Sequence, residues 1–515
     1  MVEAELIHRR RWWTLGVMAL SLLVIGLDNT ILNVALPTLV RDLGATSSQL
    51  QWMVDAYILV FAGLLLTMGA LGDRFGRRRA LTMGLILFGL GSLGAALAQS
   101  ANMLIATRAA MGIGGALIMP STLSIITNVF SGEERGRAIA AWAAISGLGI
   151  IGGPVLGGWL LEHFWWGSVF LVNVPIVILA VVAGRFLVPE SKDPSATPLD
   201  PVGAGLSIAG LSALVYAIIE APAKGWTDPV ILGGFGLAAV LLGALVWWEL
   251  RTPHPMLQMS FFKNPRFSAA SASITLVFFA LFGTVFLIAQ YLQFVLGFTP
   301  LEAGIRVMPV ATLIIAAPLS ARLTEKVGTK VVVTTGLVIV STALTILAMV
   351  EPDGGYGRVA LALSVMGFGM GMTMAPATES IMGSLPLAKA GVGSAMNDTT
   401  RQVGGALGVA VLGSVLASTY ATSMSGAVAG LPAPAAELAL DSVGGAARVA
   451  GQLGEAGTAL LRAAGSAFVD GMGNAVWVAA GVALVGAVVA ALFLPARADV
   501  PVQPETSTGV SLGTG

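Results

Sequence analysis

Residues 69–78 read Gly-Ala-Leu-Gly-Asp-Arg-Phe-Gly-Arg-Arg, and a weaker copy, Ala-Arg-Leu-Thr-Glu-Lys-Val-Gly-Thr-Lys, occupies residues 321–330. Leucine, an acid, a base, an apolar residue and glycine fall in the same register in both copies. Each copy joins two long apolar runs. Because each copy lies between apolar runs, the repetition indicates a membrane protein built from two copies of one unit. Parallel repeats of this kind are common in secondary transporters.

The composition also indicates a membrane protein. Of 515 residues, 56% are hydrophobic and only 10% are charged, whereas an average soluble protein carries about 25% charged residues. Lys and Arg together equal Asp and Glu at 27 each, so no basic excess is available to neutralise the phosphates of a nucleic acid. The chain has no cysteine and its three histidines are far apart, so we expect no disulfide, no metal site and no cofactor.

Fourteen apolar runs are long enough to cross the hydrocarbon core of a bilayer as helices, which takes roughly 20 residues for about 30 Å. Most Lys and Arg residues outside the runs lie in loops on the same side as the N-terminus, so the positive-inside rule places both termini in the cytoplasm. The runs are 14–36, 50–71, 80–99, 103–129, 137–160, 168–188, 201–220, 229–249, 267–290, 301–321, 331–350, 358–380, 391–418 and 474–494.

The two copies of the charged turn are eight spans apart, which fits two six-helix halves with two helices inserted between them. We expect segment 419–471, rich in Ala and Gly, to lie outside and to contain an amphipathic helix against the outer surface, with a disordered loop as the alternative. The predicted parts are a cytoplasmic segment 1–13, a first half 14–188, inserted helices 201–249, a cytoplasmic linker 250–266, a second half 267–494 and a disordered tail 495–515.

Several motifs resemble those of one transporter family. Residues 69–78 resemble the signature loop of the major facilitator superfamily, and residues 27–37 (LDNTILNVALP) resemble the first-helix motif of its fourteen-helix drug:proton antiporter branch. The resemblance covers about residues 10–495. Further matches to that branch are 108–115 (RAAMGIGG), 149–158 (GIIGGPVLGG), 173–175 (NVP) and 397–405 (NDTTRQVGG).

The resemblance implies an all-α integral membrane protein with the major facilitator fold. It implies a proton-coupled exporter of amphipathic, drug-like compounds in the cytoplasmic membrane of a bacterium, working by alternating access. Its partners would be small molecules, protons and the lipid bilayer, with no nucleotide and no nucleic acid. The proton gradient would supply the energy.

The signature loop has two interpretations. Its glycines suit a tight turn, and its arginines hold the turn at the cytoplasmic face, which describes a simple anchor. The family resemblance implies instead a latch that stabilises one of the two access states. The residues that we assign to this gating role are Gly69, Gly72, Asp73, Arg74, Gly76 and Arg77.

The fifth span carries a ridge of small residues. Gly149, Gly153 and Gly157 are spaced four apart, which allows another helix to approach closely, and Pro154 allows a kink. Tight packing alone would explain this pattern. The resemblance implies more, because in the superfamily such a Gly-Pro pattern marks antiporters.

Ionisable residues inside spans are functional candidates, since each costs about 2.5–3.5 kcal/mol at a helix centre on insertion scales. We expect Asp28 to face the central cavity and to exchange a proton, with Arg108 and Asp55 at similar depth influencing its proton affinity. The alternatives are a static Asp–Arg pair and, for Asp55, simple solvation near the membrane interface.

A second group of polar residues lies toward the cytoplasmic side. Glu379 ends the twelfth span, and Asp398 and Arg401 share a face at the start of the thirteenth. We assign Glu379 and Asp398 to proton coupling and Arg401 to structure or gating.

Two other classes of function compete with drug export. One is dedicated export or import of a single metabolite, lipid or siderophore. The other, more remote, is a membrane-embedded receptor or enzyme. The sequence has no His-Glu-x-x-His motif and no Gly-x-x-x-x-Gly-Lys-Ser/Thr loop, so we expect neither an enzyme nor an ATP-driven pump.

Overall fold

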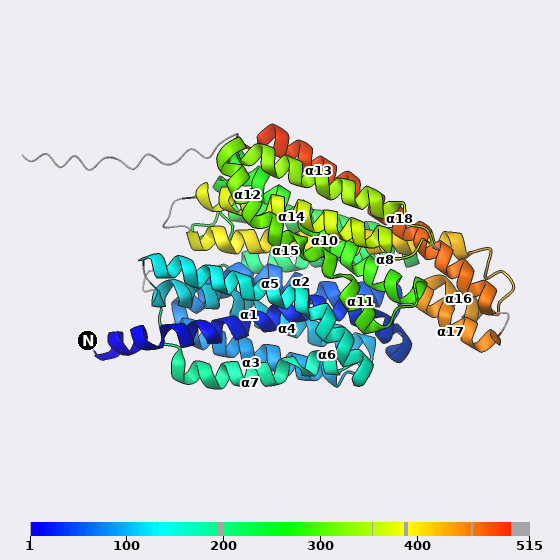
Figure 1. Cartoon of the computed structure of the whole chain (residues 1–515), viewed down its shortest axis with the longest axis horizontal. Coiled ribbons are helices and arrows are strands. Elements are labelled where there is room, and N and C mark those ends of the chain that lie inside the picture. Colours follow the sequence, from blue (N-terminus) through cyan, green and yellow to red (C-terminus); the bar gives the residue numbers. More distant parts are fainter. Residues whose placement is uncertain are drawn as a thin grey trace, which may run out of the picture.

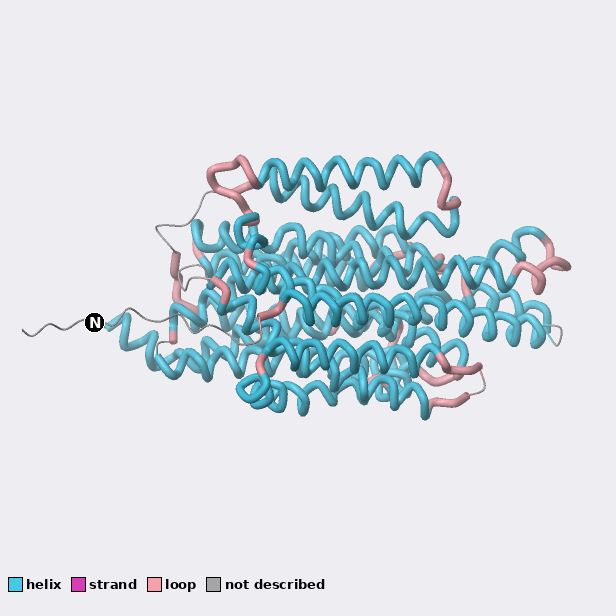
Figure 2. Tube along the Cα trace, turned by 90° about the horizontal axis from the view of Figure 1, so that it is seen from above, coloured by secondary structure: helices cyan, strands magenta, loops and turns pink. Residues whose placement is uncertain are grey.

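A computed structural model describes residues 2–130, 132–192, 199–352, 354–385, 390–454 and 457–495. The described chain is helical throughout apart from its connections, with no strand in these ranges (Figure 2). The expected disordered tail lies outside the described residues from position 496 onward.

The helices form two groups and an inserted pair (Figure 1). The N-terminal group contains α1 (Val2–Leu43), α2 (Ser47–Phe75), α3 (Arg77–Ala96), α4 (Ala101–Val129), α5 (Gly132–His163), α6 (Ser168–Leu171) and α7 (Asn173–Leu187). The inserted pair is α8 (Pro201–Lys224) and α9 (Pro229–Glu249). The C-terminal group contains η1 (Met259–Lys263), α10 (Pro265–Gln290), η2 (Tyr291–Val295), α11 (Pro300–Arg306), η3 (Met308–Thr312), α12 (Leu313–Val327), α13 (Thr329–Ala348), α14 (Gly357–Gly383), α15 (Ala390–Met424), α16 (Ala433–Asp441), α17 (Val443–Leu453) and α18 (Gly457–Phe493).

Thirteen helical segments of the described chain are long and apolar enough to cross a membrane. They coincide with thirteen of the fourteen expected runs. The remaining run, 137–160, lies within α5, a helix of 32 residues. The run 301–321 lies within one of these segments, Pro300–Val327, in which the short 3-10 helix η3 interrupts the α-helix between α11 and α12. Pro309 explains the interruption, because it has no amide hydrogen to donate to the preceding turn.

The two groups repeat the same packing. In the N-terminal group α1 packs on α5 and α3 on α4, and in the C-terminal group α10 packs on α15 and α13 on α14. The α3–α4 contact and the α13–α14 contact contain glycines at matching positions. A Cβ on Gly84 would lie 2.9 Å from the carbonyl oxygen of Gly114, and a Cβ on Gly336 would lie 2.8 Å from that of Gly369. Only glycine permits these helices to approach so closely.

The repeated charged turn also has matching geometry. Gly76 ends α2 with φ 123°, and Gly328 ends α12 with φ 88°. Both values lie in the region that glycine adopts at little cost. The chain therefore reverses at the same position of each copy.

The bundle has two distinct ends. The start of α1, which carries Arg9 and Arg10, and the α2–α3 turn lie at what we call the N-terminal end. The helices α16 and α17 form a helical hairpin at the opposite, hairpin end (Figure 1). The expected long connection 419–471 is shorter in the structure, because α15 continues to Met424 and α18 begins at Gly457. In its described residues, 425–454, the connection contains two short helices, in place of the alternative of a disordered loop.

The hairpin is fastened to the N-terminal group. The backbone amide of Ser47, at the start of α2, donates to the Asp441 carboxylate at 3.1 Å, and the Ser47 hydroxyl donates to the Asp441 carbonyl at 2.8 Å. The N-terminus of a helix favours a carboxylate. The hairpin thus links the C-terminal group, from which it arises, to α2.

Candidate functional site

An ion pair between Asp28 of α1 and Arg108 of α4 lies at the centre of the N-terminal group. Asp28 is 0% and Arg108 is 1% exposed. The Arg108 Nε donates to the carbonyl oxygen of Met53 at 3.0 Å, and its guanidinium lies 4.4 Å from the centre of the Tyr57 ring. The pairing expected from similar depth is therefore present, and it also involves α2.

Two further helices complete the surroundings of Asp28. Asn173 of α7 places its Nδ2 3.4 Å from Asp28 Oδ1 and 3.1 Å from the Ser92 hydroxyl of α3. Ser92 in turn donates to the carbonyl of Phe170 at 2.8 Å. The sequence motif included Asn173 without giving it this role; the signal was a polar residue at the start of an apolar run. Asp28 is sealed among helices of one group in this conformation, with no solvent exposure.

Asp55 lies apart from this ion pair. It is 0% exposed, and neither carboxylate oxygen has a hydrogen-bond partner among the described residues. Gln51, one turn earlier on α2, lies against Gly413 of α15, where a Cβ on the glycine would be 2.7 Å from Gln51 Cδ. Farther along, Gly63 contacts Ile208 of α8. Asp55 therefore lies on the side of α2 that faces the C-terminal group and the inserted pair.

The second expected group is only partly assembled. Arg401 Nη1 lies 3.8 Å from Asp398 Oδ1, and Arg401 Nη2 donates to the Thr378 hydroxyl at 3.3 Å. The guanidinium also lies 5.4 Å from the centre of the Phe278 ring. Glu379 is exposed and is not brought to this cluster.

The signature loop is held within the N-terminal group. Asp73 accepts from Arg77 at 2.7 Å, and the Arg77 amide donates to the carbonyl of Ser191 at 2.9 Å. Glu190 accepts from the Arg78 amide at 3.1 Å. The remaining loop residues pack locally, with Gly69 against Pro120, Gly72 against Ser121, and Arg74 over the Phe75 ring.

The glycine ridge of α5 has two functions in packing. Gly149 and Gly153 face α1, with their added Cβ positions 3.1 Å from Gly26 Cα and from the Leu27 carbonyl oxygen, and Gly157 contacts Ile31 of the same helix. The neighbouring Gly158 and Pro154 instead meet α11 of the C-terminal group. A Cβ on Gly158 would lie 2.5 Å from Leu301 Cα, and Gly304 approaches the Pro154 carbonyl.

Contacts between the two groups gather toward the hairpin end. Besides the α5–α11 contact, Glu162 accepts from the Leu301 amide at 3.3 Å, and Gln293 donates to the Val34 carbonyl at 2.9 Å. The hairpin adds the Ser47–Asp441 link. These contacts close the space between the groups at that end.

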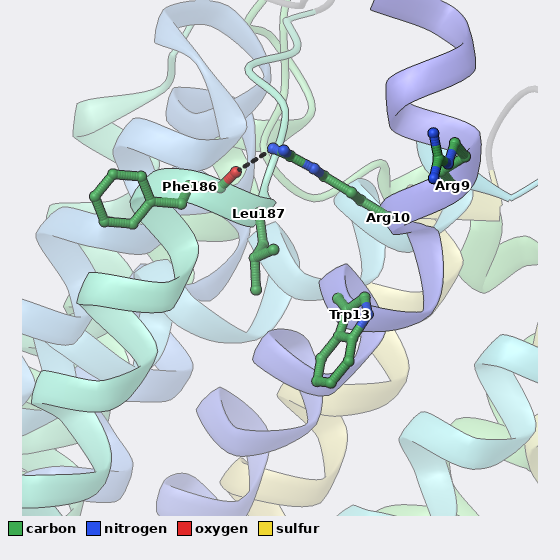
Figure 3. A pocket seen from close by; sticks show the side chains of 5 residues that line it. All are labelled: Arg9, Arg10, Trp13, Phe186 and Leu187. Atoms are coloured by element: carbon green, nitrogen blue, oxygen red, sulfur yellow. Dashed lines mark hydrogen bonds between the residues drawn. The ribbon is translucent and has the colours of Figure 1, made fainter.

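Two surface hollows of the described chain lie away from the buried acids. One of about 500 Å³ opens at the N-terminal end, where Arg10 donates to the carbonyl of Phe186 (Figure 3). Another of about 480 Å³ lies where α5 meets α11 and η3. Asp28 and Asp55 line neither hollow. The first is lined by Arg9, Arg10, Trp13, Phe186 and Leu187, as Figure 3 shows.

The sequence matches the family model described as Major Facilitator Superfamily over residues 18–409. The chain belongs to this superfamily. It is accordingly an all-α, multi-pass membrane transporter and not an enzyme. The expected family and fold are thereby confirmed.

Similar proteins extend along nearly the whole chain. The multidrug efflux pump LfrA of Mycolicibacterium smegmatis is 37% identical over 483 residues, which is 93% of this chain and 95% of LfrA. The methyl viologen resistance protein SmvA of Salmonella typhimurium is 36% identical over 468 residues, 89% of this chain and 93% of SmvA. A solved bacterial homolog of the human lysosomal transporter Spinster, in an inward-facing and unoccupied conformation, aligns with a TM-score of 0.65 at 19% identity, covering 95% of this chain and 98% of that one.

Proposed function

We propose that this transporter exports amphipathic, drug-like compounds from the cytoplasm in exchange for protons. Relatives whose names specify multidrug efflux or methyl viologen resistance match it along about nine-tenths of its length, which supports this class of substrate. The proton gradient supplies the energy, without a cofactor. The membrane is the cytoplasmic membrane of a bacterium.

The N-terminal end faces the cytoplasm. The start of α1 and the α2–α3 turn lie at this end, and both are rich in arginine, in agreement with the positive-inside rule. The hairpin end then faces outward. Because the two groups make their contacts toward the hairpin end, the conformation corresponds to one closed to the outside.

A buried acid without a partner is the observation that carries the coupling mechanism. An ionised carboxylate buried in this way costs far more free energy than a neutral acid. In the proposed mechanism Asp55 is therefore protonated in this conformation, because it is buried and has no hydrogen-bond partner among the described residues. It lies about 12 Å, or eight residues, along α2 from the helix start near the hairpin end, so opening of that end gives it access to the outside.

Asp28 and Arg108 act on the same helix from its other side. Arg108 binds the Met53 carbonyl two residues before Asp55, so a change in the Asp28–Arg108 pair moves the backbone that carries Asp55. For exchange to occur, substrate and proton must bind the inward-open and outward-open states with different affinities. A ligand that binds both states equally does not change the equilibrium between them. In this mechanism a change in the Asp28–Arg108 ion pair is transmitted through the Met53 backbone to Asp55.

The test uses purified protein in vesicles with an imposed pH gradient. Proton flux is followed on addition of several unrelated lipophilic cations, in wild type and in Asp55→Asn, Asp28→Asn and the exposed control Glu437→Gln. We expect flux with several compounds in wild type and the control, and at least about a tenfold loss in both aspartate variants, which is about 1.4 kcal/mol in the transport barrier.

Two outcomes would contradict the proposal in different ways. Proton flux with one compound or none in wild type would remove the multidrug function and favour a dedicated exporter. Full coupling in Asp55→Asn and Asp28→Asn would show that neither acid carries the proton, and would direct attention to Asp398.

A further inference from the structure

A second pair of acids lies where the inserted helices meet at the N-terminal end. Asp200 immediately precedes α8, and Glu249 is the last residue of α9. The two side chains are buried, with residue exposures of 7% and 3%. Asp200 Oδ2 and Glu249 Oε1 each lie 2.7 Å from the point where a Cβ on Gly203 would sit. The two carboxyl groups therefore face each other across the absent side chain of Gly203.

The surroundings of Asp200 suit an ionised carboxylate. Its Oδ1 accepts from the Gly203 amide at 2.8 Å, and the indole Nε1 of Trp248 lies 3.0 and 3.1 Å from the two oxygens. Asp200 is the N-cap of α8, where the helix dipole favours a negative charge. These hydrogen bonds and the dipole of α8 therefore stabilise a negative charge on Asp200.

The surroundings of Glu249 disfavour a second negative charge. Glu249 lies at the C-terminal end of α9, where the helix dipole repels an anion. Its Oε2 accepts from the Leu257 amide at 3.0 Å, while its Oε1 is buried and has no partner among the described residues. This unpartnered oxygen is the one that faces Asp200.

No described cation neutralises the pair. On the linker that follows α9, Arg251 stacks 4.6 Å from the Trp247 ring centre, and His254 is exposed. The helices packed against α8 are α2, α15 and α9, and no charged side chain described on them forms an ion pair with Asp200 or Glu249. Two adjacent buried carboxylates cannot both be ionised without a counter-charge at acceptable cost.

We propose that Asp200 and Glu249 form a proton-binding site separate from Asp28 and Asp55, in which one proton on Glu249 Oε1 is donated toward Asp200 Oδ2. The bound proton is the ligand, and the site is a carboxyl–carboxylate pair. It stands on the inserted helices and does not depend on the proposed drug:proton exchange.

The same site also holds the linker, residues 250–266, against the inserted helices α8 and α9 through a hydrogen bond. Glu249 Oε2 holds the Leu257 amide, and the neighbouring Met256 sulfur accepts from the Thr67 hydroxyl of α2 at 3.3 Å. The linker continues through η1 into α10, the first long helix of the C-terminal group. Loss of the proton would place two like charges together and would loosen this linker as the cytoplasmic pH rises.

Infrared spectroscopy of the full chain in vesicles tests the proton directly. The carbonyl stretch of protonated carboxylic acids is followed across a pH titration in wild type, Glu249→Gln, Asp200→Asn and Asp228→Asn. Asp228 is a matched control, because it caps α9 through the Val230 amide but is only partly buried and has no acid that forms a pair with it. We expect one component of the protonated signal at neutral pH to be present in wild type and Asp228→Asn and absent from Glu249→Gln. The component that belongs to the proton proposed on Asp55 should remain in every variant.

The Asp200→Asn variant adds an independent check. Removing the neighbouring negative charge makes ionisation of Glu249 easier, so its band should disappear at lower pH than in wild type. A spectrum at neutral pH that is unchanged in Glu249→Gln would overturn the proposal. Displacement of the band by excess sodium or magnesium ions at constant pH would also overturn it, because the site would then hold a metal ion.

Linker mobility tests the structural consequence. The chain has no cysteine, so His254→Cys provides a single attachment point for a spin label on the exposed linker. We expect label mobility to increase with pH in the otherwise wild-type chain and to remain constant when Glu249→Gln is added. An equal pH response in both chains would contradict the fastening role.

Discussion

Arg108 satisfies three groups at once: the carboxylate of Asp28, the carbonyl of Met53 and the face of the Tyr57 ring. Removing one member of a buried ion pair leaves an uncompensated charge and costs about 3–5 kcal/mol. We expect Arg108→Ala to lower the free energy of unfolding by an amount of that order. Thermal unfolding in detergent measures the effect.

The double variant Asp28→Asn/Arg108→Ala provides the control for this prediction. It removes both charges, so we expect it to regain much of the stability lost in Arg108→Ala. Equal stability of Arg108→Ala and wild type would show that the pair contributes nothing to the fold.

Asp441 gives a pH prediction at the same scale. Burial raises the pKa of this carboxyl above its ordinary value, against the opposing effect of the Ser47 amide that donates to it. A raised folded-state pKa means that the folded chain binds the proton more tightly than the unfolded chain. Its contribution to stability is therefore full below the ordinary aspartate pKa and is lost as pH rises through the folded-state value.

We expect the melting temperature of wild type to fall, relative to that of Asp441→Asn, as pH rises across this interval. Thermal unfolding of both proteins at a series of pH values checks the prediction. Parallel curves for the two proteins would contradict it.

At the scale of elements, the glycines of α5 make two kinds of contact. Some face α1 within the N-terminal group, and Gly158 faces α11 of the C-terminal group. Gly158 admits Leu301 of α11, whereas Gly152, on the same helix, has no atom within 4 Å of an added Cβ. We expect Gly158→Ala to push α5 and α11 apart and to reduce transport by about tenfold or more, with Gly152→Ala close to wild type. Substrate efflux from vesicles measures both, and equal activities would contradict this role of the contact.

The sequence predicted the elements better than it predicted the partners of individual side chains. Hydropathy located the spans because each must present apolar residues to lipid over a fixed length. It placed the end of α15 and the start of α18 wrongly, because these helices continue beyond the apolar stretch into the hairpin. It did not predict the 3-10 helix η3 inside the span Pro300–Val327, although Pro309 was a visible signal.

Depth along a helix predicted that Asp28 and Arg108 would meet, but depth says nothing about which side of a helix faces which neighbour. The exposure of Glu379, and the lack of a hydrogen-bond partner for Asp55 within the described part of the chain, depend on helix rotation and packing, which apolar runs do not encode. The same holds for the Asp200–Glu249 pair, whose members are far apart in sequence. Only the antiparallel packing of α8 and α9 brings them together.

At the scale of the whole molecule, the contacts at the hairpin end imply that the two groups must separate there once in each transport cycle. Glu162 on α5 and the Leu301 amide on α11 meet across the groups at 3.3 Å. Because the chain has no cysteine, Glu162→Cys/Leu301→Cys can be joined by a short bifunctional thiol reagent without background reaction. We expect cross-linking to abolish transport and reduction of a cleavable linker to restore it.

A cross-link within one group is the matched control. Arg11 and Glu134 form an ion pair at 2.9 Å between α1 and α5, both in the N-terminal group. If the groups move as units, joining Arg11→Cys to Glu134→Cys leaves most transport intact, because no relative motion of the groups is blocked. Continued transport in the fully cross-linked Glu162→Cys/Leu301→Cys protein would show that the hairpin end stays closed throughout the cycle, and would place the path of the substrate elsewhere.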